Sequence, residues 1–152
     1  MHSENFIVID APIEKIFEAS SNLVIWPAIL PHYRSIRFLE QSRSRTVVAM
    51  AAWRRIPSLG SMGIPVQWTS QFELDRARRE IRFLHLKSFT RGMRVVWTFE
   101  QLAEGVKVRI IHDLEPTFPL FRTFITEIIL GRFFIHSIAN QTLKHMKQYL
   151  EK

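Results

Sequence analysis

The chain has 152 residues, of which 47% are hydrophobic, so residues 1–152 are expected to form one domain with a sizeable core. It contains no cysteine, which excludes a disulfide framework and a thiolate metal site. The first residues lack the basic region and apolar run of a secretion signal. The most apolar stretch, Leu114–Ile138, is interrupted by charged residues and two prolines. We therefore expect a cytoplasmic protein without a transmembrane helix.

The formal net charge is +7, and the basic residues fall in short clusters such as Arg76, Arg78 and Arg79. A nucleic-acid-binding protein more often shows one dense basic stripe or a recognisable reading motif, so no nucleic-acid partner is expected. The clusters lie at or near turns between apolar segments. Two explanations stay open: charge that solvates loops, or attraction to anionic ligands or a membrane surface.

The chain begins with a predicted strand at Phe6–Ile9. A helix should follow, capped by the Asp10 side chain and carrying Pro12 in its first turn. A second short helix is expected from about Asn22, before the prolines that follow, Pro27 first, break the chain.

Six more strands are predicted from period-two alternation and from the turn residues between them. In the clearest of them, alternate residues from Val66 to Leu74 share one face, which includes Trp68, Ser70 and Phe72. The short connections between strands indicate antiparallel hairpins. The predicted strands are Tyr33–Glu40, Thr46–Trp53, Val66–Leu74, Glu80–Leu86, Met93–Glu100 and Val106–Leu114.

The end of the chain reads as one long helix from about Phe121 to Leu150, because apolar residues recur there at steps of three and four. One strand, two short helices, six strands and a long helix are the element order of an α+β protein, with the two short helices between the first two strands.

Three segments carry a resemblance to a known family: APIEKIFEASSNLVIWPAILPHYRSIRFLE, VQWTSQFELDRARREIRF and WTFEQLAEGVKVRIIHDLEP. They resemble the START-like (SRPBCC, Bet v 1-like) superfamily and, within it, the polyketide cyclase/dehydrase group. The chain is also similar to the coenzyme Q-binding branch. The resemblance covers nearly the whole chain. It implies a helix-grip fold, in which a curved antiparallel β-sheet wraps around a long C-terminal helix and encloses an apolar cavity.

The resemblance also implies pocket residues. Trp26 and Tyr33 match an aromatic residue and a tyrosine that line the pocket mouth of aromatase/cyclases. Trp68 and Ser70 match an inward-pointing pair on the pocket strand.

The chain departs from the family pattern at two pocket arginines, which are thought to grip and polarise the polyketide's oxygens. Phe72 and His85 stand in their places. This departure predicts a less cationic pocket and a ligand that is more apolar and less oxygenated than a long poly-β-keto chain.

Strand parity turns His85 inward and its neighbour Arg82 outward. His112 shares the face of Val108 and Ile110, so it also points inward. Enclosed histidines should stay neutral. They either form structural hydrogen bonds, or bind a ligand oxygen and handle its protons.

Two functions follow. The first is a polyketide cyclase/dehydrase-like enzyme, with Tyr33 and His85 as catalytic residues. The alternative is a non-enzymatic module that binds or transports a lipid or quinone. Either ligand is an apolar small molecule. No cofactor is expected, and no metal site either, because the histidines lack close spacing. The expected ligand-binding residues are Trp26, Trp68, Ser70, Phe72, Trp97 and His112.

Residues 54–65 join two strands and are long for a hairpin loop. Their apolar residues follow two arginines, so this segment is interpreted as a cavity lid, as a peripheral membrane contact, or as a loop that packs over its own sheet. The sequence leaves the oligomeric state open.

Overall fold

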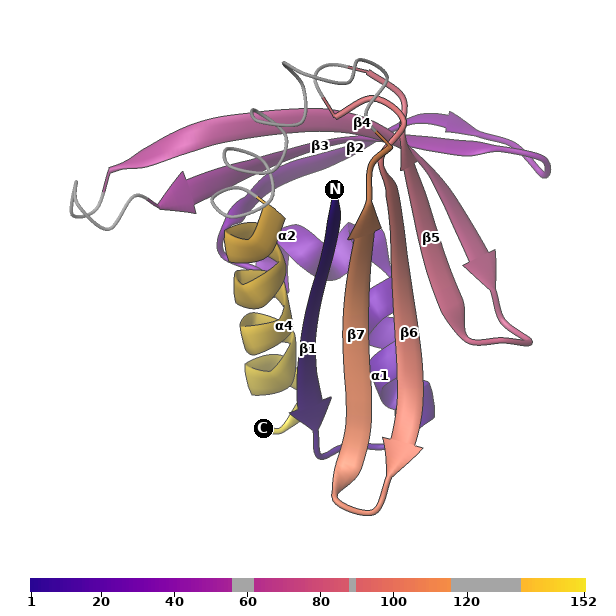
Figure 1. The fold of residues 1–152 in the computed structure, drawn as a ribbon, viewed down its shortest axis with the longest axis vertical. Coiled ribbons are helices and arrows are strands. Elements are labelled where there is room, and N and C mark those ends of the chain that lie inside the picture. The colour runs from indigo at the N-terminus through magenta and orange to yellow at the C-terminus, as the bar shows by residue number, and fades with distance from the viewer. Residues whose placement is uncertain (56–61, 88–89, 116–134) are drawn as a thin grey trace.

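The computed structural model describes residues 1–55, 62–87, 90–115 and 135–152, and its centre is one seven-stranded antiparallel sheet. The strand order is β1-β7-β6-β5-β4-β3-β2. The sheet is strongly bent: β2, β3 and β4 run across one end of the molecule, crosswise to β1, β6 and β7 (Figure 1). The strands are β1 (His2–Ile9), β2 (Tyr33–Gln41), β3 (Thr46–Arg55), β4 (Gly63–Asp75), β5 (Glu80–His85), β6 (Arg94–Leu102) and β7 (Gly105–Asp113).

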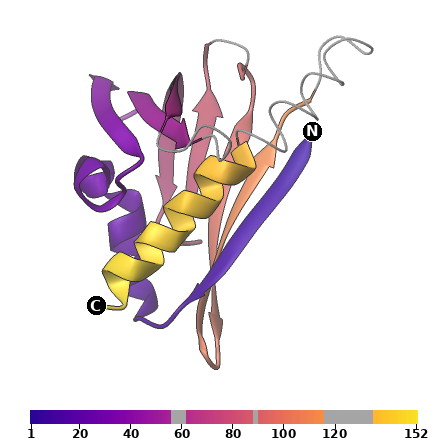
Figure 2. The same ribbon diagram turned by 90° about the vertical axis from the view of Figure 1, so that its left-hand side faces the viewer.

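Helix α4 (His136–Leu150) lies across the concave side of the sheet (Figure 2). The short elements between β1 and β2 are α1 (Ile13–Ser21), the 3-10 turn η1 (Leu23–Ile25) and α2 (Trp26–Ile29). This arrangement confirms the predicted α+β helix-grip fold. Of the predicted long helix, residues 121–134 lie outside the described residues.

Strand pairing confirms the predicted hairpins and lengthens several strands. β4 pairs with β5 and β6 with β7, as expected. β1 begins at His2 rather than Phe6, because it pairs with β7 as far as Asp113. β3 and β4 stay paired up to Arg55 and Gly63, so both ends of the segment predicted as a loop are strand. Met62 precedes β4, and residues 56–61 lie outside the described residues.

Two predictions about the first helices were wrong. Asp10 does not cap α1: Pro12 is the N-cap residue, and no side chain bonds to the helix start. The backbone N–H of Asp10 instead donates to Glu151 at 2.9 Å, which ties the end of β1 to the C-terminus. Pro27 does not end a helix but lies in the first turn of α2. Backbone N–H groups in a first turn have no acceptor within the helix, so a proline there loses no hydrogen bond.

Polar contacts fix α4 to β1. The side-chain amide of Asn5 donates to Asn140 Oδ1 at 2.7 Å and contacts His136 Nδ1 at 2.9 Å. Lys147 Nζ donates to the carbonyl of Val8 at 2.7 Å. Because Asn5 is buried, these bonds hold the helix in one register on the strand.

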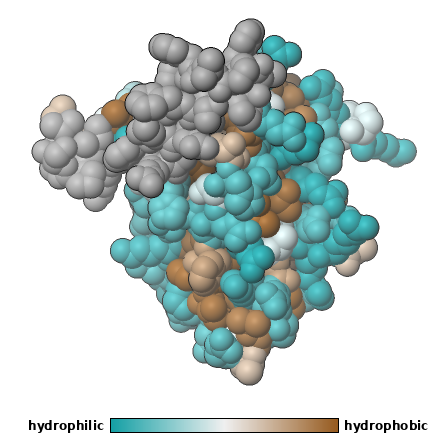
Figure 3. All heavy atoms as spheres, in the orientation of Figure 1, coloured by the Kyte–Doolittle hydropathy of each residue, from teal (hydrophilic) through white to brown (hydrophobic). Residues whose placement is uncertain are grey.

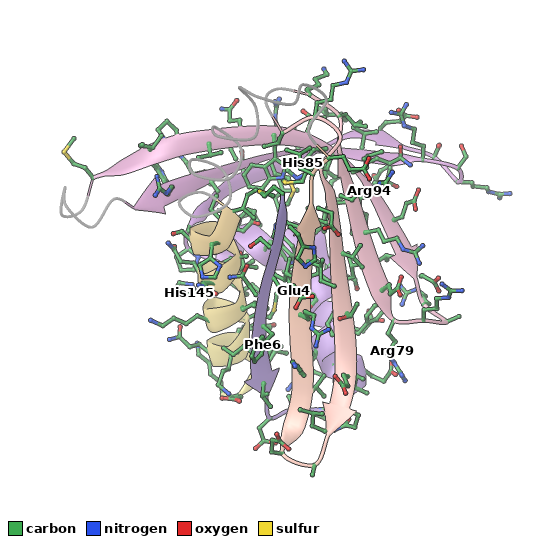
Figure 4. The ribbon with its side chains drawn as sticks, viewed as in Figure 1. Glu4, Phe6, Arg79, His85, Arg94 and His145 are labelled. Carbon is green, nitrogen blue, oxygen red and sulfur yellow. The ribbon has the colours of Figure 1, made fainter. Side chains whose placement is uncertain are left out.

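Arginines of the basic cluster after β4 form ion pairs at the protein surface. In the turn between β4 and β5, Arg76 donates to Glu18 at 2.9 Å and Arg79 pairs with Glu14, both on α1. Arg79 points away from the sheet toward that helix (Figure 4). In the view of Figure 3, hydrophilic residues cover most of the described surface, with smaller hydrophobic areas among them. Charge that solvates and ties loops therefore accounts for this cluster.

Candidate ligand cavity

A cavity of about 90 Å³ lies between the concave face of the sheet and α4. Its described lining is mostly apolar and contains no aspartate, glutamate, lysine or arginine. The described residues that line it are Trp26, Tyr33, Met50, Val66, Gln67, Trp68, Phe83, His85, Thr90, Met93, Val95, Trp97, Ile110, His112, Ile135, Ile138, Ala139 and Thr142.

Aromatic rings form a connected wall of this cavity. The Trp26 ring lies 5.3 Å from the Tyr33 ring and 5.5 Å from the Trp97 ring. Trp68 lies 6.0 Å from Tyr33 and is stacked on His85 at 6.1 Å, with an interplanar angle of 5°. Rings packed at these separations hold one another in place, so the wall is shaped before a ligand enters.

His85 ends β5, and the turn that follows fixes its backbone and its ring. Its N–H donates to the Met93 carbonyl and its carbonyl accepts from Gly92, both at 2.9 Å. Its Nδ1 lies 2.8 Å from the Thr90 hydroxyl, which leaves Nε2 as the ring nitrogen available to a ligand. Burial lowers the pKa of His85 to about 4, so the ring is neutral at physiological pH, as the sequence predicted.

His112 on β7 is the second histidine of the lining, two strands away from His85. Burial, with a smaller contribution from the charge of His85, lowers its pKa to about 3. Its Nδ1 is buried and has no hydrogen-bond partner among the described residues. A buried lone pair without a partner costs less than a buried N–H without one, so Nε2 carries the proton. His112 is therefore a hydrogen-bond donor through Nε2.

Tyr33 begins β2 and is buried beside Trp26 and Trp68. Burial raises the pKa of its hydroxyl, which stays protonated. The ring of His32 lies 4.7 Å from the Tyr33 ring, and His32 Nε2 lies 2.8 Å from the hydroxyl of Thr142 on α4. Burial lowers the pKa of His32 to about 4, with a smaller contribution from His145.

Six of the eight predicted site residues line the cavity together: Trp26, Tyr33, Trp68, His85, Trp97 and His112. Ser70 and Phe72 are not among the lining residues. Ser70 is fully buried opposite His85 on the paired strand, and its hydroxyl has no hydrogen-bond partner in the part of the chain that the structure describes. The ring of Phe72 lies 5.2 Å from that of its cross-strand partner Phe83, a lining residue, so it packs beside the cavity wall on the same face of the sheet.

Sequence reasoning missed Thr90 and the contact between His32 and Thr142. Thr90 lies in an irregular turn, and no local pattern reports which side chain it meets. Thr142 belongs to the apolar stripe of the last helix, and that stripe is the signal that places it against the sheet.

Within the described residues, no group of three or more histidine, cysteine, aspartate or glutamate side chains is placed to hold a metal ion. The helices of the described part include none with the length and apolar character needed to cross a membrane.

A bent antiparallel sheet that grips a C-terminal helix over an apolar cavity is the START-like helix-grip fold. The sequence matches a family model described as "Polyketide cyclase / dehydrase and lipid transport" over residues 9–141. The chain belongs to this family and is a polyketide cyclase-like protein.

Similar proteins agree with this assignment. A Streptomyces halstedii protein named "Putative polyketide cyclase" is 29% identical over 111 residues, which cover 72% of this chain and 97% of the relative. Among solved structures, a Thermus thermophilus protein has a TM-score of 0.76 at 19% identity and covers 99% of this chain and 97% of its own. The Zhui aromatase/cyclase from Streptomyces sp. R1128 has a TM-score of 0.72 at 18% identity, with coverages of 99% and 93%. At these identities the two structures show the fold alone.

Proposed function

We propose that the chain binds a neutral, largely aromatic small molecule in the cavity and promotes a cyclisation or dehydration of it there. The observation that carries this proposal is the lining: aromatic rings surround two neutral histidines, and no described lining side chain is charged. An anionic or highly oxygenated ligand would lose its hydration in such a cavity without gaining charged partners.

The chemistry would centre on His85 and Tyr33. The free Nε2 of His85 could take or return the proton next to a ligand carbonyl, as a general acid–base group. The Tyr33 hydroxyl, held in its protonated form by burial, would serve as a hydrogen-bond donor and not as a base. Enclosure would supply most of the effect, because intramolecular ring closure depends on holding one folded conformation of the substrate.

A pair of substitutions on β4 tests cavity binding. Val66 lines the cavity, so Val66→Trp should fill it and abolish binding of naphthalene-sized probes. Gln71→Trp adds the same ring to the same strand, outside the cavity lining, and should leave binding unchanged. Calorimetry with both variants, each checked by thermal denaturation, measures this. Equal affinity in both variants would contradict the proposal.

The second candidate function is carriage of a lipid or quinone, and the paired end of β3 and β4 favours it. Met62 and Ile64 are exposed there, at 67% and 38%, and Ile64 pairs with Arg54, the residue after Trp53 on β3. The guanidinium of Arg34 lies 4.6 Å from the Trp53 ring centre. Exposed apolar side chains next to cations suit insertion between anionic lipid headgroups. The protein would then collect its ligand at a membrane surface.

Vesicle flotation separates the two functions. A carrier should float with vesicles that contain anionic lipid, and the double variant Met62→Ser/Ile64→Ser should lose this property. The variant Leu39→Ser removes another exposed apolar residue, on β2, and serves as the control. Absence of flotation on both anionic and neutral vesicles would leave the cyclase-like function as the better account.

A further inference from the structure

The hydrogen bond between His85 and Thr90 can form in two ways. A threonine hydroxyl both donates and accepts, and a neutral imidazole has one nitrogen of each kind. If Thr90 donates to Nδ1, the free Nε2 of His85 carries the ring proton and donates to a ligand. If Thr90 accepts from Nδ1, the free Nε2 is an acceptor. The structure gives the Thr90 hydroxyl no other hydrogen-bond partner among the described residues, so nothing there fixes the choice.

The ring of His85 cannot turn freely to make the same change. It is stacked on Trp68 at 5° and bonded to Thr90 at 2.8 Å, so its orientation is held while its proton can move from one nitrogen to the other. His112, in contrast, is fixed as a donor because its buried Nδ1 has no partner within the described ranges of the chain. The cavity therefore contains one fixed donor and one group of variable role.

We propose that Thr90 is a positioning residue that lets His85 bind either a carbonyl or a hydroxyl, so the cavity accepts both the keto and the enol or phenol form of its ligand. The inference rests on the proposed function, because it requires the ligand to occupy this cavity. A carbonyl oxygen accepts from His85 Nε2–H. A hydroxyl donates to the bare Nε2 once the ring proton is on Nδ1 and is donated to Thr90. A ligand that enolises or becomes aromatic would thus keep a partner at each stage.

Three neutral probes of similar size test the inference by calorimetry at neutral pH: 2-tetralone carries a carbonyl, 2-naphthol a hydroxyl and naphthalene neither. Wild-type protein should bind the first two more tightly than the third. The variant Thr90→Val keeps the shape and removes the hydroxyl. His85 Nδ1 is then unpaired and keeps its lone pair, so Nε2–H becomes a permanent donor. Binding of 2-tetralone should be retained. 2-Naphthol should weaken roughly tenfold, because its hydroxyl is a strong donor but its oxygen, whose lone pair is delocalised into the ring, accepts only weakly.

The control is Thr90→Ser, which keeps the hydroxyl and should bind both oxygenated probes as wild type does. His112→Phe removes the fixed donor and should weaken both probes by similar factors. If Thr90→Val weakened 2-tetralone and 2-naphthol equally, Thr90 would have a structural role only and the inference would be overturned. If wild-type protein bound none of the three probes, the proposed function itself would fail.

Discussion

His32 and His85 are both buried, both neutral and both bonded to a threonine at 2.8 Å, yet their surroundings give them different roles. The Thr142 hydroxyl donates its only proton to the Ile138 carbonyl at 2.8 Å, so it must accept from His32 Nε2. Thr90 has no such second partner among the described residues. One histidine is therefore committed to joining α4 to the start of β2, whereas the other keeps a nitrogen of variable role for a ligand. The second partner of the threonine is thus what separates the structural role of His32 from the ligand-binding role that we propose for His85.

The largest expected effect is on stability as the pH falls. His32, His85 and His112 have folded pKa values of about 4, 4 and 3, below the ordinary value of 6.5. At any pH between a folded pKa and 6.5 the unfolded chain binds more protons than the folded chain, so acid favours unfolding. Above about pH 7 these histidines are neutral in both states, and their contribution to the free energy of unfolding should be constant. Below pH 6.5 it should fall by about 1.4 kcal/mol per pH unit for each histidine. Urea denaturation between pH 7 and 5 measures this. A flat profile would show that the three rings are not buried neutral.

The next effect concerns the structural histidine. Thr142→Val removes the acceptor of the His32 N–H and leaves that buried donor unpaired, which should cost about 1–3 kcal/mol of unfolding free energy. Thr142 also lines the cavity, but valine has nearly the same shape there, so ligand affinity should change much less than stability. Urea denaturation and calorimetry on the same samples check both parts. A loss of affinity without a loss of stability would reverse the roles assigned to the two histidines.

A substitution at His85 should instead lower ligand affinity more than it lowers the free energy of unfolding. His85→Phe keeps a flat ring against Trp68 but removes both nitrogens, so binding of 2-naphthol and 2-tetralone should weaken about tenfold. Naphthalene, which makes no hydrogen bond, should bind as before. Stability should change by about 1 kcal/mol or less, because the lost partner, Thr90, can turn its hydroxyl. Equal weakening of all three probes would point to a change in cavity shape instead.

The smallest effect is expected where the charges are exposed. Arg79→Ala removes the pair with Glu14, whose side chain is 65% exposed, so the free energy of unfolding should fall by about 0.5 kcal/mol or less. The effect should shrink further in high salt. Thermal denaturation at low and high salt tests this. A loss comparable to that of Thr142→Val would mean that the turn between β4 and β5 contributes more to folding than its exposed contacts suggest.

Sequence periodicity was sufficient for the features that depend on which way a side chain points. Strand parity placed His85 and His112 inside, and both are buried and line the cavity. Strand parity could not distinguish residues that line the cavity from other buried residues on the same face of the sheet. Ser70, for example, shares the face of Trp68 but does not line the cavity. Parity gives a direction only, and the depth of a residue depends on how far the sheet bends and where α4 rests.

The errors arose where long-range contacts override local signals. Asp10 is a good cap residue by type, yet its backbone is bonded to Glu151 at the far end of the chain. The residues after Met1 look like a polar tail, but pairing with β7 makes them strand. Thr90 could not be assigned a role from its position in a turn, because that role comes from its contact with His85.

Helix α4 is tied by polar bonds toward both edges of the sheet, and this has a consequence for ligand exchange. In the part of the chain that the structure describes, its polar ties lead to β1 and the residue after it at one edge, and to His32, directly before β2, at the other. None of these described ties leads to β4, β5 or β6. Over these middle strands the described contacts of the helix are dispersion contacts, which yield gradually, whereas the bonds at the two edges are directional. Guests of increasing bulk should therefore be accommodated by small shifts between α4 and the middle strands, with the bonds to β1 and His32 unchanged.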